Sequence, residues 1–172
     1  TVMSWINPQA PDVAGRAYRP VSTGSGNGVD RGWGFALRFG DTAGTATSVR
    51  LTTYGVADND SLTFPVVFGE WIHIAATYNN GAIDYYLNGT QLGGSDVSLF
   101  GNDGAAARLT IGGRLGGNDF DQTNGLLDGV QVYDQVLNAS QIQAAAVASL
   151  VPEPSSFALA GFLSAALLRR RR

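Results

Sequence analysis

The stretch 69–94, GEWIHIAATYNNGAIDYYLNGTQLGG, constrains the fold more than any other part of the chain, because it contains two hairpin signals in succession. Its first part, 70–78, is rich in aromatic and β-branched residues, which favour a strand. The Asn-Asn-Gly at 79–81 and the Asn-Gly at 88–89 accept the positive φ of tight hairpin turns. Apolar and polar residues alternate over 82–87. The stretch therefore predicts a three-stranded antiparallel meander.

The rest of the chain predicts more short strands between loops rich in Gly, Asn and Asp, without alternating strands and helices. This pattern predicts an all-β fold: a two-sheet antiparallel jelly-roll sandwich. The strands are expected at 1–7, 17–22, 32–39, 48–55, 62–67, 70–78, 82–87, 90–92, 107–112 and 126–133. We expect 56–61 to be an acidic loop. A short helix should run to about residue 149, with either Asn138 or Ser140 as its cap.

Charge and cysteine content exclude several classes of partner. The chain has no cysteine, so neither a disulfide framework nor a thiolate metal site can form. All eleven basic residues are arginines, and four of them end the chain. The remaining seven face fourteen acidic residues, which leaves an acidic body without the basic stripe that phosphate binding needs. We therefore expect no nucleic-acid partner.

The meander and the closing segment resemble known sequences. The pattern W-x-H-x-A-x-T-Y, then N-G, then Y-x-L-N-G, resembles laminin-G-like domains of the concanavalin A-like lectin/glucanase superfamily. The IGG at 111–113 and GLLDGVQVYDQVLNASQI at 125–142 resemble the closing strand and helix of the same family. The resemblance implies one jelly-roll domain over 1–150. It also implies that Thr1 lies within a strand and that the family's first strand is missing from this chain.

The segment 151–172 contains a Pro-Glu-Pro motif, an apolar run over 157–168 and a terminal arginine cluster. These three features in this order resemble the PEP-CTERM sorting signals that exosortases process in Gram-negative bacteria. An apolar helix of that length would span about 18 Å, against a membrane core of about 30 Å. We therefore expect a short hydrophobic tail helix and transient contact with the inner membrane before cleavage, with the arginines on the cytoplasmic side. The motif residues are Pro152, Glu153, Pro154, Arg169, Arg170, Arg171 and Arg172.

Catalysis is not expected. His73 is the only histidine, and no nucleophile or carboxylate stands at a recognisable spacing from it. Glucanases of the similar superfamily carry paired carboxylates on an E-x-D-x-E strand. Here the only glutamates are Glu70, which stands alone before a strand, and Glu153 of the sorting motif. The sequence predicts a structural role for His73 and a non-catalytic protein.

Calcium is the one candidate cofactor. It prefers six to eight oxygen ligands, often from loop carboxylates. Asp119 and Asp121, with Asn118 beside them, could provide several, and Asp128 resembles the family's acidic residue in the closing strand. The alternative is that these residues belong to solvated acidic loops, or that Asp128 fixes neighbouring loops by hydrogen bonds.

A glycan site would need exposed aromatic rings beside polar side chains. The candidates are Trp33, Tyr54, Tyr86 and Asn118, with Tyr133 as a further aromatic. For each ring, packing in the core is the alternative. Trp5 and Trp71 match core positions of the similar family and are expected to be buried.

Together these features predict an exported, non-catalytic module that binds a glycan or a surface protein. We expect it at the cell surface or in the extracellular matrix. One alternative is a structural component of an exopolysaccharide or biofilm matrix without a specific ligand. The other is a divergent glycoside hydrolase.

Overall fold

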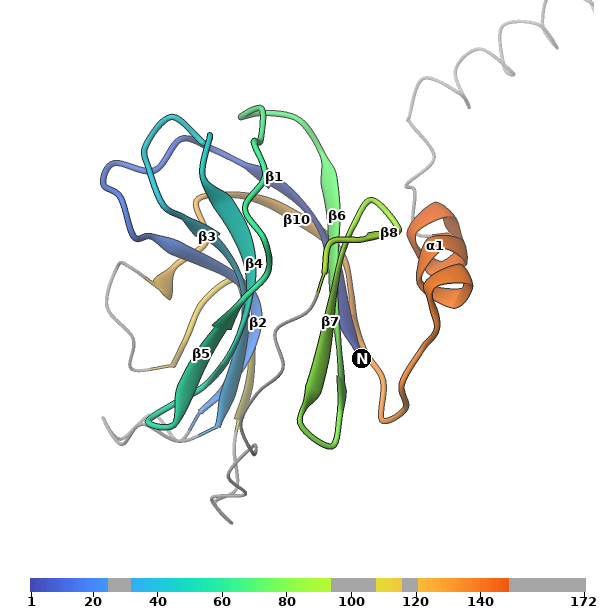
Figure 1. The fold of residues 1–172 in the computed structure, drawn as a ribbon. Helices are drawn as coiled ribbons and strands as arrows, with labels where there is room; N and C mark the ends of the chain where they lie inside the picture. The colour runs from blue at the N-terminus through green and yellow to red at the C-terminus, as the bar shows by residue number, and fades with distance from the viewer. Residues whose placement is uncertain (25–31, 94–107, 116–120, 149–172) are drawn as a thin grey trace, which may run out of the picture.

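The computed structural model describes residues 1–24, 32–93, 108–115 and 121–148. This part contains ten strands and one helix (Figure 1). The sorting segment, Asn118 and Asp119 lie outside it, so the predictions made for them remain predictions. The elements are β1 (Val2–Pro8), β2 (Ala17–Gly24), β3 (Trp33–Phe39), β4 (Thr47–Thr53), β5 (Ala57–Asp60), β6 (Ile72–Asn79), β7 (Ala82–Leu87), β8 (Thr90–Gln91), β9 (Arg108–Ile111), β10 (Gly125–Val132) and α1 (Ala139–Ala148).

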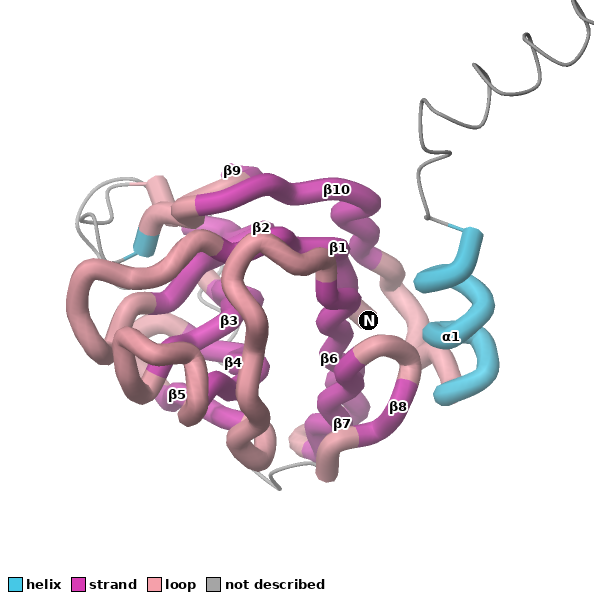
Figure 2. The backbone as a smooth tube through the Cα atoms, turned by 90° about the horizontal axis from the view of Figure 1, so that it is seen from above, coloured by secondary structure: helices cyan, strands magenta, loops and turns pink. Residues whose placement is uncertain are grey.

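The strands form two antiparallel five-stranded sheets that face each other. Sheet A has the order β10-β1-β6-β7-β8, and sheet B has the order β5-β4-β3-β2-β9. Helix α1 lies on the side of sheet A that faces away from sheet B (Figure 1), and the view from above shows the same layering (Figure 2). The predicted two-sheet jelly-roll sandwich with a short helix is confirmed.

The main core fills the space between the sheets. Alternate residues of β3 and β4 point inward, so that Phe35, Leu37 and Phe39 of β3 lie in this core. Trp33 is only partly buried but packs against this core. The buried members are Val2, Ile6, Tyr18, Val21, Phe35, Leu37, Phe39, Val49, Leu51, Phe64, Val66, Ile74, Ala76, Ile83 and Tyr85.

The meander forms as its turn residues predict. Asn80 and Asn88 adopt positive φ angles of 47° and 50°, and each is followed by a glycine at positive φ. Strand β6 pairs with β7, and β7 pairs with β8, both antiparallel. The two tight turns therefore fix the register of half of sheet A.

Two local predictions were wrong around β5. Ala57–Asp60 is an edge strand of sheet B, not a loop, because its two aspartates are compensated from the neighbouring strand. Arg50 stands opposite Asp60, and Thr52 stands opposite Asp58. The expected strand at 62–67 is reduced to one isolated bridge, between Thr47 and Phe64.

Helix α1 begins at a cap that the sequence had left open between two residues. Asn138 Oδ1 accepts a hydrogen bond from the backbone N–H of Gln141, at 3.0 Å. In return, Gln141 Oε1 accepts a bond from the backbone N–H of Asn138, at 2.9 Å. This reciprocal arrangement satisfies two donors at the helix start, so Asn138 is the cap.

Candidate functional site

The outer face of sheet A is sealed by α1 through a second apolar cluster. Its buried members are Met3, Ala75, Tyr86, Leu137 and Ile142. Tyr86, predicted as an exposed aromatic platform, is 4 % exposed and belongs to this cluster, so its expected exposure is wrong. The helix therefore closes this face to a large ligand.

His73 lies in the same layer and has the surroundings of a structural residue. It is 1 % exposed, and its ring meets Trp5 edge to face at a centroid distance of 5.3 Å. Trp5 Nε1 donates a hydrogen bond to the Ala146 carbonyl of α1, at 3.2 Å. Burial lowers the pKa of His73 to about 4, so the imidazole is neutral at pH 7.

Trp71 departs from the expectation of burial. It is 44 % exposed, because it precedes β6 and is not paired in the sheet. Trp5 is partly buried, as its place against His73 requires.

The outer face of sheet B is polar and carries a pocket of about 400 Å³. The turn between β4 and β5 forms one side of this polar pocket, and β2 and the segment after β9 contribute an arginine each. Its lining residues are Arg19, Thr52, Thr53, Tyr54, Gly55, Val56, Ala57, Asp58 and Arg114.

Tyr54 stands between two guanidinium groups in this pocket. The Cζ atom of Arg114 lies 3.8 Å from the ring centroid, and that of Arg19 lies 5.3 Å from it. Contacts at these distances are attractive cation–π interactions. Tyr54 is 7 % exposed, so its expected exposure is wrong, although it does line the pocket. The sequence correctly singled out the Tyr54 ring as part of a candidate site, but the guanidinium of Arg114 lies over that ring.

Asp121 holds both arginines in place. Its Oδ1 accepts a bond from Arg19 Nε at 2.7 Å, and its Oδ2 lies 3.8 Å from Arg114 Nη1. Residues 19 and 121 are far apart in the sequence, so neither arginine could be identified as a site residue from local pattern. Asp121 thus joins the loop after β9 to the outer face of sheet B.

Gly34 leaves the space that the side chains of Arg19 and Tyr54 occupy at the base of the pocket. A Cβ atom placed there would lie 2.7 Å from Arg19 Nη1 and would also collide with Tyr54 Oη. Both of these polar atoms are buried and make no hydrogen bond of normal geometry within the described residues. Burial raises the pKa of Tyr54, more than nearby Arg19, Ser22 and Arg114 lower it. A buried polar group without a partner costs about 1–3 kcal/mol, so the base holds unused hydrogen-bonding capacity.

The other end of the same face is acidic. Arg50 bonds Asp60 Oδ2 at 2.6 Å and Asp58 Oδ2 at 2.5 Å, and Thr52 also bonds Asp58. Burial raises the pKa of Asp60, but its bond to Arg50 and the charge of that arginine lower it, and the net shift is downward. The Asp58 side chain is 51 % exposed and lines the pocket, so its carboxyl oxygens are available to a ligand.

The carboxylates that the structure describes do not test the predicted calcium site. Asp121 faces two guanidinium groups, which does not suit a cation. Asp128 lies in β10 opposite Trp5, where its Oδ1 accepts a bond from the N–H of Gly129. In the described ranges, no group of three or more His, Asp or Glu side chains is placed to hold a metal ion. With Asp119 outside these ranges, a calcium site stays a prediction.

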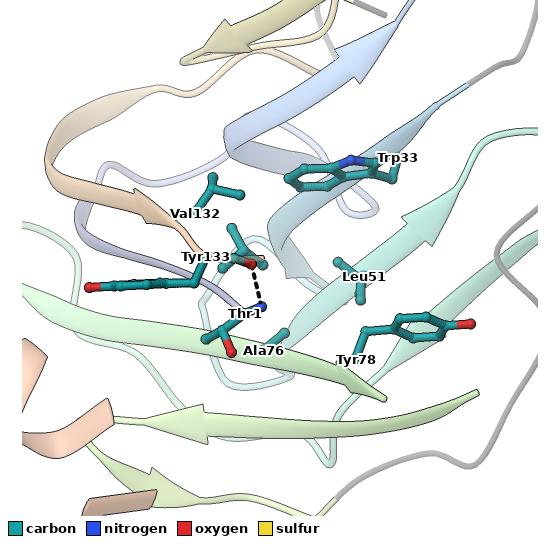
Figure 3. A pocket seen from close by; sticks show the side chains of 8 residues that line it. Thr1, Trp33, Leu51, Ala76, Tyr78, Val132 and Tyr133 are labelled. Carbon is teal, nitrogen blue, oxygen red and sulfur yellow. Dashed lines mark hydrogen bonds between the residues drawn. The ribbon is translucent and has the colours of Figure 1, made fainter. Parts of the chain in front are cut away.

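Trp33 lines a different cavity, of about 310 Å³, between the two sheets near Thr1 (Figure 3). Its walls are mainly apolar, and Tyr78 and Tyr133 are also among its lining residues. The amino group of Thr1 donates to the Tyr133 carbonyl at 3.0 Å. The structure therefore does not bring Trp33, Tyr54 and Tyr86 together into one site.

A two-sheet jelly roll with a helix on one outer face and a polar pocket on the other defines a lectin-like sandwich. Residues 1–143 match the concanavalin A-like lectin/glucanases superfamily, and the chain belongs to that family. Residues 150–172 match the PEP-CTERM protein-sorting motif, which marks an exported protein. Among the described residues, no helix has the length and apolar character needed to cross a membrane.

Relatives of known structure share the fold. A SAP-like pentraxin from Limulus polyphemus is 18% identical, with a TM-score of 0.65 over 84% of this chain and 68% of that one. The CBM40 of a Ruminococcus gnavus IT-sialidase, bound to α2,3-sialyllactose, is 17% identical, with a TM-score of 0.61 over 84% and 82%. Adhesion G-protein coupled receptor V1 of Danio rerio is 31% identical over 150 residues, which are 83% of this chain and 2% of the receptor.

Proposed function

We propose that this chain is an exported, non-catalytic module that binds a glycan in the polar pocket on the outer face of sheet B. The observation that carries the proposal is the set of hydrogen-bonding groups around Tyr54. Arg19 Nη1 and Tyr54 Oη are buried there and have no hydrogen-bond partner among the described residues, and Asp58 is an exposed acceptor at the other end. Sugar hydroxyls both donate and accept, so a glycan can use both ends of the pocket.

Similar folds support a glycan over a protein ligand. The Ruminococcus gnavus CBM40 is bound to sialyllactose, and domain 4 of a Geobacillus stearothermophilus arabinanase is in complex with arabinotriose. Both are low-identity neighbours that share the fold, so their ligands suggest a class and not an identity. A surface protein remains the alternative ligand.

The carboxylates around the pocket favour binding over hydrolysis. A glycosidase needs one carboxyl group that can donate a proton and a second that acts as base or nucleophile. Asp58 is bonded by Arg50, and Asp121 is bonded by Arg19. Each of these two carboxylates is thus engaged by an arginine, which supports a non-catalytic role.

The sorting motif supports the remaining part of the proposal. An exosortase-type enzyme would process the tail after transient contact with the inner membrane of a Gram-negative bacterium. The mature protein would then reside at the cell surface or in the extracellular matrix. Retention of Arg169–Arg172 in mature protein extracted from the inner membrane would contradict this route.

A glycan array tests the binding function. The wild-type protein should bind a restricted set of glycans, and Gly34→Ala should lose that binding while remaining folded. The added methyl group pushes Arg19 Nη1 and Tyr54 Oη from their positions, and thermal unfolding reports whether the fold is kept. Repeating the array with a chelator tests whether calcium contributes.

Two outcomes would contradict the proposal. If the wild-type protein binds no glycan on the array, the result would favour a structural matrix component without a specific ligand. If the purified domain hydrolyses a β-glucan, the result would favour a divergent glycoside hydrolase.

A further inference from the structure

The polar pocket is asymmetric in the chemistry it offers. At the end formed by β2 and the loop after β9, Arg19 and Arg114 flank Tyr54. At the β5 end, Asp58 and Asp60 share Arg50. Of these two aspartates only Asp58 lines the pocket, so a ligand that fills it meets guanidinium donors at one end and the Asp58 carboxylate at the other.

The unmet group at the arginine end is a donor. Arg19 is 6 % exposed, its Nε donates to Asp121, and its Nη1 is buried without an acceptor in the part of the chain that the structure describes. A guanidinium can donate but cannot accept, so only an acceptor can satisfy Nη1. A carboxylate is the strongest match, because both partners of the hydrogen bond are then charged and the planar geometry of the guanidinium fits a carboxylate.

We infer that the glycan bound in this pocket carries a carboxylate, as a uronic or sialic acid does, and that this carboxylate lies at the Arg19–Tyr54–Arg114 end. The inference rests on the proposed glycan-binding function. Tyr54 Oη, also buried without a normal hydrogen bond, provides a second donor beside Nη1. The sugar hydroxyls then face Asp58, where an anionic group would be repelled.

Access to Nη1 requires movement of a side chain. Arg19 and Tyr54 are both more than nine-tenths buried, whereas the Arg114 side chain is 19% exposed and lies over the ring. Arg114 is therefore the residue that moves from the ring and closes on the carboxylate. Such side-chain rearrangement is common at binding sites whose backbone stays fixed.

The test compares acids with their methyl esters, which keep the sugar and remove the charge. Tetragalacturonate, a hyaluronan tetrasaccharide and sialyllactose are titrated calorimetrically, each beside its ester. At least one acid should bind about tenfold or more tightly than its ester, as expected for one charge-assisted hydrogen bond. Arg114→Gln should remove most of that difference.

Arg108→Gln is the matched control, because Arg108 is an exposed arginine of β9 that does not line the pocket. It should leave the preference for the acid unchanged. Tyr54→Phe, which keeps the ring, should weaken binding of the acid more than binding of the ester.

The inference is overturned if none of the acids binds more tightly than its ester, or if Arg114→Gln and Arg108→Gln behave alike. In either case, a neutral glycan that binds and is lost in Gly34→Ala would leave the proposed function standing. Failure of every acidic and neutral glycan on the array would remove both.

Discussion

The two outer faces of the sandwich have opposite characters, although they belong to sheets of the same size. The outer face of sheet A is apolar and lies beneath α1, whose sequence contains no charged residue. The outer face of sheet B carries Arg19, Arg50, Asp58 and Asp60, and no described helix covers it. Apolar side chains need a cover, whereas paired charges can remain at the surface.

The two outer faces therefore differ in role: one contributes to stability and the other to ligand binding. The apolar side chains beneath α1 contribute to stability because they are buried against one another, although both ring nitrogens of His73 have no hydrogen-bond partner among the described residues. The groups around Tyr54 include buried donors that no described residue satisfies, which is unfavourable for stability and suits a ligand. Changes beneath α1 should therefore affect unfolding, and changes around Tyr54 should affect binding.

The largest effect is expected beneath the helix. Ile142 is fully buried between α1 and sheet A, so Ile142→Ala should lower the free energy of unfolding by about 2–5 kcal/mol. Chemical denaturation measures this loss. Val147, which is 63 % exposed on the same helix, is the matched site, and Val147→Ala should change stability by less than about 0.5 kcal/mol. Equal effects at both sites would show that α1 does not seal this face.

Acid should weaken the same face. Burial lowers the pKa of His73 in the folded protein to about 4, below its ordinary value of about 6.5, so the unfolded chain binds the proton first. The full contribution is present above pH 6.5 and is lost as the pH falls toward 4, by about 3 kcal/mol in total. Urea unfolding at a series of pH values measures the loss. In His73→Phe this part of the pH dependence should vanish, and its persistence would assign it to other groups.

The smallest effect on stability is expected at the polar pocket. Within the described ranges, Tyr54 Oη makes no hydrogen bond of normal geometry, whereas Tyr85 Oη donates to the Asn59 carbonyl at 2.6 Å. Tyr85→Phe should therefore cost about 1 kcal/mol, and Tyr54→Phe should leave stability unchanged or raise it slightly. Thermal unfolding of the two variants distinguishes them. A loss at Tyr54 equal to that at Tyr85 would mean that the Tyr54 hydroxyl is already satisfied.

Local chemistry made much of the fold predictable. The two Asn-Gly turns, the alternation in β3 and the cap at Asn138 depend on neighbours in sequence, and all three occur as expected in kind. The strand β5 was not predicted because its acidic residues are typical of loops. The pairing with β4, which brings Arg50 opposite Asp60, is not visible in the local sequence.

The candidate site was less predictable because it depends on contacts between distant residues. Tyr86 is buried because a helix that starts more than fifty residues later covers it. Arg19 becomes a site residue only through Asp121, at a sequence separation of 102. No periodic pattern in the sequence predicts the burial of Tyr86 or the pairing of Arg19 with Asp121. The sequence could therefore single out Tyr54 as an aromatic residue, but not the arginines around it.

The central claim is that the outer face of sheet B is the recognition surface. The most direct test is an NMR titration of the isotope-labelled protein with the tightest-binding glycan found on the array. The backbone amides of Arg19, Tyr54 and Asp58 should shift most, while those of α1 stay in place. Shifts confined to α1, or to the cavity lined by Trp33 and Tyr78, would contradict the account.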